Sequence, residues 1–259
     1  MFDFPKVEHK YFNKNFLKTV IFRIDFEENN KIFEKKKEIT DLFSALLPRI
    51  SDKETKGIQI SFSNDQTPIL QSVDNINTGK VIEMKSIDGQ RILAINKSSL
   101  TYTIGGQSYS NSIDLKKELN LLIDFYKISE IKFLKRLAFR KINIIEFKIS
   151  NNPSEILLQL ISPDLLSNLA YFPKSNSIKQ NIHSLIYQDG DYSLNIKYGL
   201  NIPPIQNIGI GQIIIDIDLF NTSKIETSET IKIADMINSE IFNIFNWAIS
   251  ENTKRLLNG

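Results

Sequence analysis

The chain contains the same eight-residue motif twice, Phe-Leu-Lys followed by three variable residues and then Phe-Arg. The first copy runs from Phe16 to Arg23 and the second, 117 positions later, from Phe133 to Arg140. Each copy opens an extended apolar segment that is followed by a helical pattern. Self-similarity at a fixed period indicates a repeated structural unit, so we expect an internally duplicated α+β fold.

The first copy lies in a segment with the alternation of a half-buried strand, from Leu17 to Phe26. Residues 31–47 then show helical spacing, and Pro48 ends it because proline is incompatible with a helix interior. Turn residues separate the extended segments that follow, at about 57–63, 69–73, 80–86, 91–96 and 100–104. The pattern predicts a meander of hairpins and then a helix from Ser112, its N-cap, to about Tyr126.

The second copy opens the same order of elements. A long strand is predicted from Phe133 to Ile149, and Pro153 then begins a helix that ends near Ile161. A second antiparallel meander is predicted from the extended segments at about 178–187, 191–198 and 208–220.

The last helix is predicted from Ser228 to about Leu257, with Thr227 as an alternative cap. Its apolar residues cover more than the stripe of about 100° that a surface helix needs. They are Ile233, Ala234, Ile237, Ile241, Ile244, Phe245, Ala248 and Ile249, with Phe242 and Trp247 beside the stripe. The surplus favours packing against both halves of the chain; the alternative is a homodimer or a protein partner bound through this helix.

We therefore predict an α+β fold in which the unit strand, helix, antiparallel meander, helix occurs twice. The strands form two sheets or one continuous sheet, with helices on one face. The first repeat would occupy residues 1–130, and the second residues 131–259 with the long C-terminal helix. Residues 127–132 contain neither Pro nor Gly, so the two halves should be rigidly joined.

Composition narrows the class of protein. The 259 residues, 41% of them hydrophobic, are enough to bury a large core. A formal net charge of +2 disfavours nucleic acid as a partner held by bulk charge, and leaves local basic patches open. The sequence has no cysteine and two histidines, so we predict neither a metal site nor a cofactor. No apolar run is long enough for a membrane span, and we expect a cytoplasmic protein.

Several short motifs resemble those of a sporadically distributed family of uncharacterised bacterial and archaeal proteins of about this length. Tyr11–Phe22 resembles the family's Leu-x-x-Val-x-Phe start, and Leu93–Tyr109 its strand with two tyrosines before a helix. Arg136–Asn143 resembles its Arg-Ile-Gly-Leu-Arg-Tyr-Ile-Asn motif, with Ala138 for the glycine and Lys141 for the tyrosine. The resemblance implies an accessory gene, often of a mobile-element or defence locus, and brings no catalytic residues with it.

One spacing resembles the PD-(D/E)xK nuclease core. Asp74 is followed after nine positions by Glu83 and then Lys85, and residues two apart on a strand share a face. In such a core the carboxylates hold Mg²⁺ and the lysine assists the attacking water. Two further strands are predicted after Lys85, however, where that core turns into a helix. The same Glu-x-Lys spacing occurs at Glu146 and Lys148, where the ordinary interpretation is an exposed cross-strand charge pair.

The arginines of the repeated motif are the preferred binding residues. Arg23 and Arg140 are equivalent in the two copies, and Arg136 shares the strand face of Arg140. If the two long strands lie side by side, these arginines would converge on a groove that takes phosphate or carboxylate. The alternative is pairing within the chain, for example between Arg23 and Asp25.

Asp216 and Asp218 could together hold a divalent cation, because hard cations prefer oxygen ligands. We interpret them instead as solvent-facing residues of a strand whose other face carries the apolar residues Ile213, Ile215, Ile217 and Leu219.

These patterns favour a non-enzymatic binding or regulatory protein that recognises a macromolecular partner, most simply a protein. Metal-dependent nucleic-acid hydrolysis through Asp74, Glu83 and Lys85 is the first alternative. A self-assembling structural protein, driven by the C-terminal helix, is the second.

Overall fold

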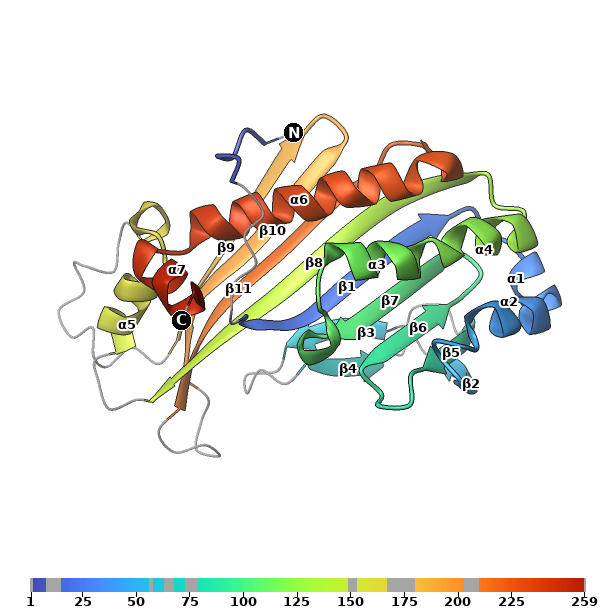
Figure 1. Ribbon diagram of the computed structural model, residues 1–259, viewed down its shortest axis with the longest axis horizontal. Coiled ribbons are helices and arrows are strands. Elements are labelled where there is room, and N and C mark those ends of the chain that lie inside the picture. Colours follow the sequence, from blue (N-terminus) through green and yellow to red (C-terminus); the bar gives the residue numbers. More distant parts are fainter. Residues whose placement is uncertain are drawn as a thin grey trace. The chain divides into compact units, whose positions relative to one another are not determined.

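The computed structural model describes residues 2–7, 15–55, 58–62, 68–72, 79–148, 153–166, 180–202 and 210–258. The strands are β1 (Leu17–Phe26), β2 (Arg49–Thr55), β3 (Ile58–Phe62), β4 (Pro68–Ser72), β5 (Gly79–Lys85), β6 (Arg91–Ile95), β7 (Ser99–Gly105), β8 (Phe133–Lys148), β9 (Gln180–Asp189), β10 (Tyr192–Asn201), β11 (Ile210–Asn221) and β12 (Ile225–Glu226). The α-helices are α1 (Lys31–Glu34), α2 (Lys36–Phe43), α3 (Ser112–Leu119), α4 (Leu121–Ser129), α5 (Pro153–Leu160), α6 (Thr230–Ala248) and α7 (Glu251–Asn258). Figure 1 labels these elements along the ribbon.

The strands pair into a ten-stranded antiparallel sheet in the order β2-β5-β6-β7-β1-β8-β11-β10-β9, with β12 beside β8. Strands β3 and β4 form a separate hairpin. This pairing confirms the predicted α+β class and selects one continuous sheet over two. The order of strands and helices recurs in both halves of the chain, whereas the duplication itself stays a prediction.

The chain divides into two compact units, each made of segments that are distant in sequence. The central unit comprises Thr19–Arg140 and Phe220–Asn238. The terminal unit comprises Met1–Lys18, Lys141–Leu219 and Ser239–Gly259.

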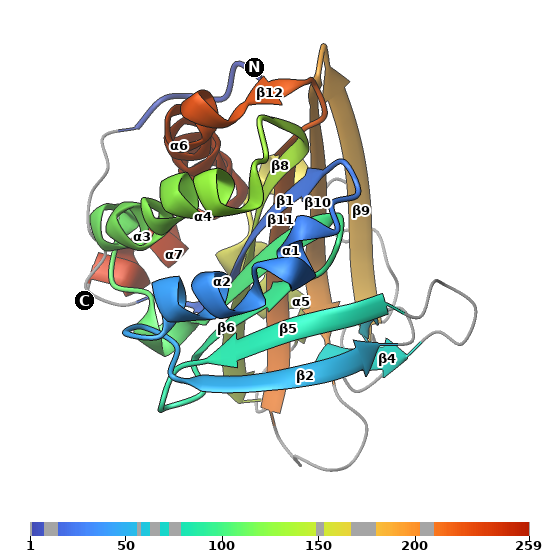
Figure 2. The ribbon, with the colours of Figure 1, turned by 90° about the vertical axis from the view of Figure 1, so that its right-hand side faces the viewer.

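The central unit packs helices α1 to α4 on one face of strands β1, β5, β6 and β7 (Figures 1 and 2). That face carries a row of apolar side chains in cross-strand register, Phe22, Tyr102, Leu93 and Met84. All four are buried, which is the reason the alternation in β1 is so regular. Helix α4 adds Phe125, whose ring lies 6.3 Å from that of Phe26, measured between centroids.

Two local predictions for this unit were wrong. The N-cap of α3 is Asn111, not Ser112, because the extended Asn111 backbone lets its side chain accept a hydrogen bond of 2.8 Å from the Asp114 N–H. Strand β2 was not predicted, because Ile50 is its one apolar residue and its pairing with β5 identifies it.

The terminal unit joins the antiparallel pair β9 and β10 to helices α5 and α7, which contact each other (Figure 1). The predicted helix over 228–257 is divided here. Ser250 donates its N–H to the Leu160 carbonyl (3.0 Å), and its hydroxyl accepts from the Thr253 N–H (3.1 Å). Serine at this position caps a new helix, so α6 ends at Ala248 and α7 begins at Glu251.

The prediction for β11 was half right. Its four alternating apolar side chains, from Ile213 to Leu219, are fully buried as expected. Asp216 was expected to face solvent, yet it is only 4% exposed. Strand β11 lies inside the sheet, between β8 and β10.

Candidate binding face of the central unit

The face of the central sheet opposite helices α1 to α4 is polar. Its residues lie in cross-strand register: Arg23 faces Thr101, Thr101 faces Ala94, Ala94 faces Glu83, and Glu83 faces Ser51. A second row runs beside the first and consists of Ile21, Thr103, Ile92, Lys85 and Arg49. We call this surface, together with Asp25, Lys53 and Arg136, the polar face.

One end of the polar face is a cluster of two arginines around one carboxylate. Arg23 Nε donates to Asp25 Oδ1 at 2.8 Å, and Arg136 Nη1 lies 3.9 Å from Asp25 Oδ2. The Arg136 guanidinium also lies 4.2 Å from the centroid of the Phe220 ring, a cation–π contact. Arg23 keeps 45% of its side chain exposed, so the cluster presents this guanidinium to solvent.

The other end repeats this arrangement with lysines. Lys53 and Lys85 each place Nζ 2.9 Å from a Glu83 oxygen, and the Glu83 side chain is 14% exposed. Burial by itself raises the pKa of Glu83, but the hydrogen bonds and charges of Lys53 and Lys85 outweigh it and hold that pKa below its usual range. Glu83 is therefore an anion shared by two cations.

Three small side chains and one isoleucine, Ile92, lie between the two clusters. Thr101 and Ala94 lie between Arg23 and Glu83, and Thr103 lies in the next row; all three are partly exposed. Three strand spacings separate Arg23 from Glu83, which corresponds to about 14 Å. Both ends of the polar face thus carry partly exposed cations.

The structure brings together part of the predicted arginine set. Arg23 and Arg136 share Asp25, so the pairing of Arg23 within the chain, named above as the alternative, is present. Arg140 is half-buried in β8, four residues after Arg136. Its neighbour Phe139 contacts Phe22, the residue before Arg23, with 5.0 Å between ring centroids. The predicted groove through all three arginines stays a prediction.

The nuclease hypothesis gains no support from this geometry. Glu83 and Lys85 share a face, as that chemistry requires, but Lys53 occupies the second side of Glu83. Strand β5 continues into β6 and β7, not into a helix. Asp74 lies outside the described residues. Within the described ranges, no three His, Asp or Glu side chains are grouped so that they could hold a metal ion.

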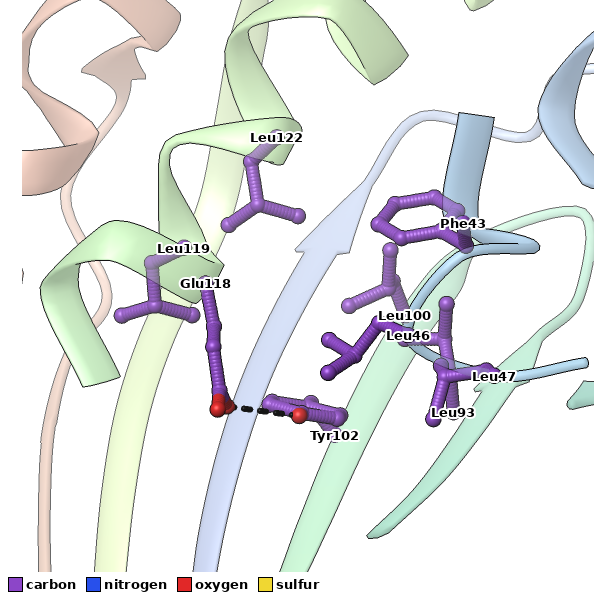
Figure 3. A pocket seen from close by; sticks show the side chains of 9 residues that line it. All are labelled: Phe43, Leu46, Leu47, Leu93, Leu100, Tyr102, Glu118, Leu119 and Leu122. Carbon is purple, nitrogen blue, oxygen red and sulfur yellow. Dashed lines mark hydrogen bonds between the residues drawn. The ribbon is translucent and has the colours of Figure 1, made fainter. Parts of the chain in front are cut away.

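The helix-covered face of the same sheet carries a polar network that the sequence did not reveal. Tyr102 Oη donates to Glu118 Oε2 at 2.7 Å (Figure 3). Arg91 Nε donates to Glu118 Oε1 at 3.0 Å. Burial, and secondly the bond to Glu118, raise the pKa of Tyr102. Glu118 directly precedes the buried Leu119 on α3. A charged residue beside a core position is the feature of the sequence that could have indicated this network.

Apolar side chains surround this network, but they do not form a ligand cavity. Leucines and a phenylalanine from α2, α3, α4, β6 and β7 line the space (Figure 3). The space left among them is about 10 Å³, the room of one water molecule. Small-molecule sites need about 300 Å³ or more, so the Arg91–Glu118–Tyr102 network is a structural element of the core.

Lys141, in the part of β8 that belongs to the terminal unit, titrates abnormally. Burial lowers the pKa of its amine from 10.5 to about 8. We expect one lysine to titrate near pH 8 in NMR spectra of the ¹³C-dimethylated protein, and Lys141→Arg to remove that signal. The unfolded chain binds this proton more tightly, so the group's contribution to stability rises with pH from about 8 to 10.5 and is constant below. Titration of every lysine above pH 9.5 would contradict the assignment.

Comparison with known proteins adds no identification. No protein-family model matches the chain, and no curated protein matches it significantly. The resemblance to the bacterial and archaeal family therefore stays a prediction. Among the described residues, no helix is both long enough and apolar enough to cross a membrane.

Proposed function

We propose that this chain is a non-enzymatic binding protein that recognises an acidic segment of a partner protein through the polar face of the central unit. The observation that carries the proposal is the pair of clusters in which two basic side chains share one carboxylate. Arg23 and Arg136 flank Asp25, while Lys53 and Lys85 flank Glu83. The lysine cluster has one positive charge in excess, and at the other cluster Arg23 keeps 45% of its side chain exposed.

The spacing of the clusters defines what the partner should look like. A carboxylate brought to each end would meet a partly exposed cation, and arginine is well suited to hold a carboxylate. The ends are about 14 Å apart, and an extended chain rises about 3.4 Å per residue. The recognised segment should therefore be extended, with two acidic residues about four positions apart and small residues between them.

Charge complementarity favours a protein over a nucleic acid. The formal net charge is only +2, so the chain lacks the broad positive field with which proteins usually attract a phosphate backbone. The partly exposed cations of the polar face lie instead at two separate sites, which suits two discrete carboxylates.

The proposal is tested by the affinity of a fluorescein-labelled nine-residue peptide with two Glu residues four positions apart in a Ser and Ala background. We expect Arg23→Gln to weaken binding about fivefold, because it removes about 1 kcal/mol of charge-assisted contact. Lys127→Gln is the matched control: it removes the same charge from a 70% exposed side chain on α4, so binding should not change. The readout is fluorescence anisotropy at low and high salt.

Three results would contradict the proposed function. Equal binding of a peptide in which Lys replaces Glu would show that charge is not recognised. Equal losses in Arg23→Gln and Lys127→Gln would show that the polar face is not the site. Tighter binding of a nine-nucleotide single-stranded DNA than of the peptide would favour a nucleic-acid partner instead.

A further inference from the structure

The terminal strand β9 is an unusually unprotected sheet edge. It ends the strand order of the described sheet and pairs with β10 over all ten of its residues. One of its faces exposes two isoleucines, Ile182 at 40% and Ile186 at 77%. An edge strand also presents a row of unpaired backbone N–H and C=O groups, which is a template for another strand.

Apart from Asp189 at its end, β9 lacks the charged residues and prolines that usually block such an edge. From Gln180 to Gln188 it contains no Lys, Arg, Asp, Glu or Pro. Natural proteins place charges or proline on exposed edge strands to prevent pairing with other chains. The absence of these residues along nine positions indicates that the edge pairs with another strand.

The residues on the exposed face of β9 form a sequence that is the same in both directions. Gln180, Ile182, Ser184, Ile186 and Gln188 form the palindrome Gln-Ile-Ser-Ile-Gln. If two copies of β9 pair antiparallel about Ser184, each Ile182 faces Ile186 of the second copy. The end glutamines face each other in the same way. An antiparallel pair of identical strands has twofold symmetry, and such symmetry requires a surface that is complementary to itself.

We propose that two copies of this chain form a dimer by antiparallel pairing of their β9 strands, centred on Ser184. The pairing buries the exposed Ile182 and Ile186 side chains against each other and satisfies the outward backbone groups of both strands. The inference is independent of the proposed function, because β9 belongs to the terminal unit and the polar face to the central unit.

Strand β9 is already fixed in an extended conformation by its contacts with β10. Ten consecutive residue pairs fix its register on β10. His183 stacks on the ring of Tyr198, with 5.2 Å between centroids, and the buried Tyr198 hydroxyl donates to the Leu165 carbonyl at 2.9 Å. Because β9 is ordered before association, pairing costs little additional chain entropy.

Sedimentation velocity across a protein concentration series tests the dimer. We expect the parent chain to dimerise with a Kd on the order of micromolar. Ile186→Lys should weaken association at least tenfold, because it places a charge on the edge strand. The exposed position makes the variant compatible with folding. Ile87→Lys is the matched control, since Ile87 is 72% exposed at the turn after β5, and it should leave the dimer intact.

Mixing variants tests the register. In pairing about Ser184, position 186 of one copy faces position 182 of the other. Equimolar Ile186→Lys and Ile182→Glu should therefore form a heterodimer, while Ile186→Lys with Ser184→Glu should not. A parent chain that stays monomeric at about 100 μM or above (about a hundredfold over a micromolar Kd), an unaffected Ile186→Lys dimer, or a mixture that fails to associate would each overturn the proposal.

Discussion

Replacing Phe125 with alanine is expected to lower the free energy of unfolding by about 3–5 kcal/mol, the usual cost of deleting a buried aromatic ring. Phe125 on α4 is fully buried, and its ring contacts Phe26 of β1 and Phe43 of α2 at centroid distances of 6.3 and 6.4 Å. It therefore joins two helices to the sheet. Urea denaturation followed by circular dichroism measures the loss.

The matched control for this prediction lies on the same helix. Ile123 is 45% exposed, so Ile123→Ala should cost less than about 1 kcal/mol. If Phe125→Ala were no more destabilising than Ile123→Ala, the described packing of α4 against the sheet would be wrong.

Replacing Gly199 with alanine should detach β9 from β10. Gly199 has a φ of +142°, which side chains rarely tolerate, and a Cβ there would lie 1.9 Å from the Asn181 carbonyl oxygen. The clash is with backbone, so β9 must move. We expect a loss of about 3 kcal/mol or more in the opening free energy of β9, measured by amide hydrogen exchange.

Gly190 provides the control for this change. It also has a positive φ, +55°, but no atom lies within 4 Å of its added Cβ. Gly190→Ala should thus cost only about 1–2 kcal/mol, the cost of the left-handed conformation. If both substitutions changed the protection of β9 equally, the close contact between Gly199 and Asn181 would be contradicted.

The sequence allowed good prediction of elements whose own residues determine their structure. Strand β1 was predicted with its bounds because it alternates strongly over a buried core. Strand β8 was predicted to within one residue, although its buried residues do not alternate regularly. Elements determined by distant partners were predicted less well. Strand β2 needs β5 to identify it, and the division between α6 and α7 depends on a contact between Ser250 and Leu160.

In the candidate site, too, contacts within one strand were predicted and contacts between distant residues were not. The pair of Arg23 and Asp25 was predicted because the two residues are two apart on one strand. The sharing of Asp25 with Arg136 joins residues more than a hundred positions apart, and Lys53 lies on the strand that was not predicted. Patterns along a single sequence do not specify such contacts, because the fold creates them.

The most direct test of the polar face is to map peptide binding by ¹⁵N NMR at the level of single residues. Titration with the acidic nine-residue peptide should shift the backbone amides of Ala94, Thr101 and Thr103, and 0.5 M NaCl (Debye length about 4 Å) should reduce these shifts. Amides of α3 and α4, on the opposite side of the sheet, should stay in place. Shifts confined to those helices, or no shifts at millimolar peptide, would contradict recognition through the polar face.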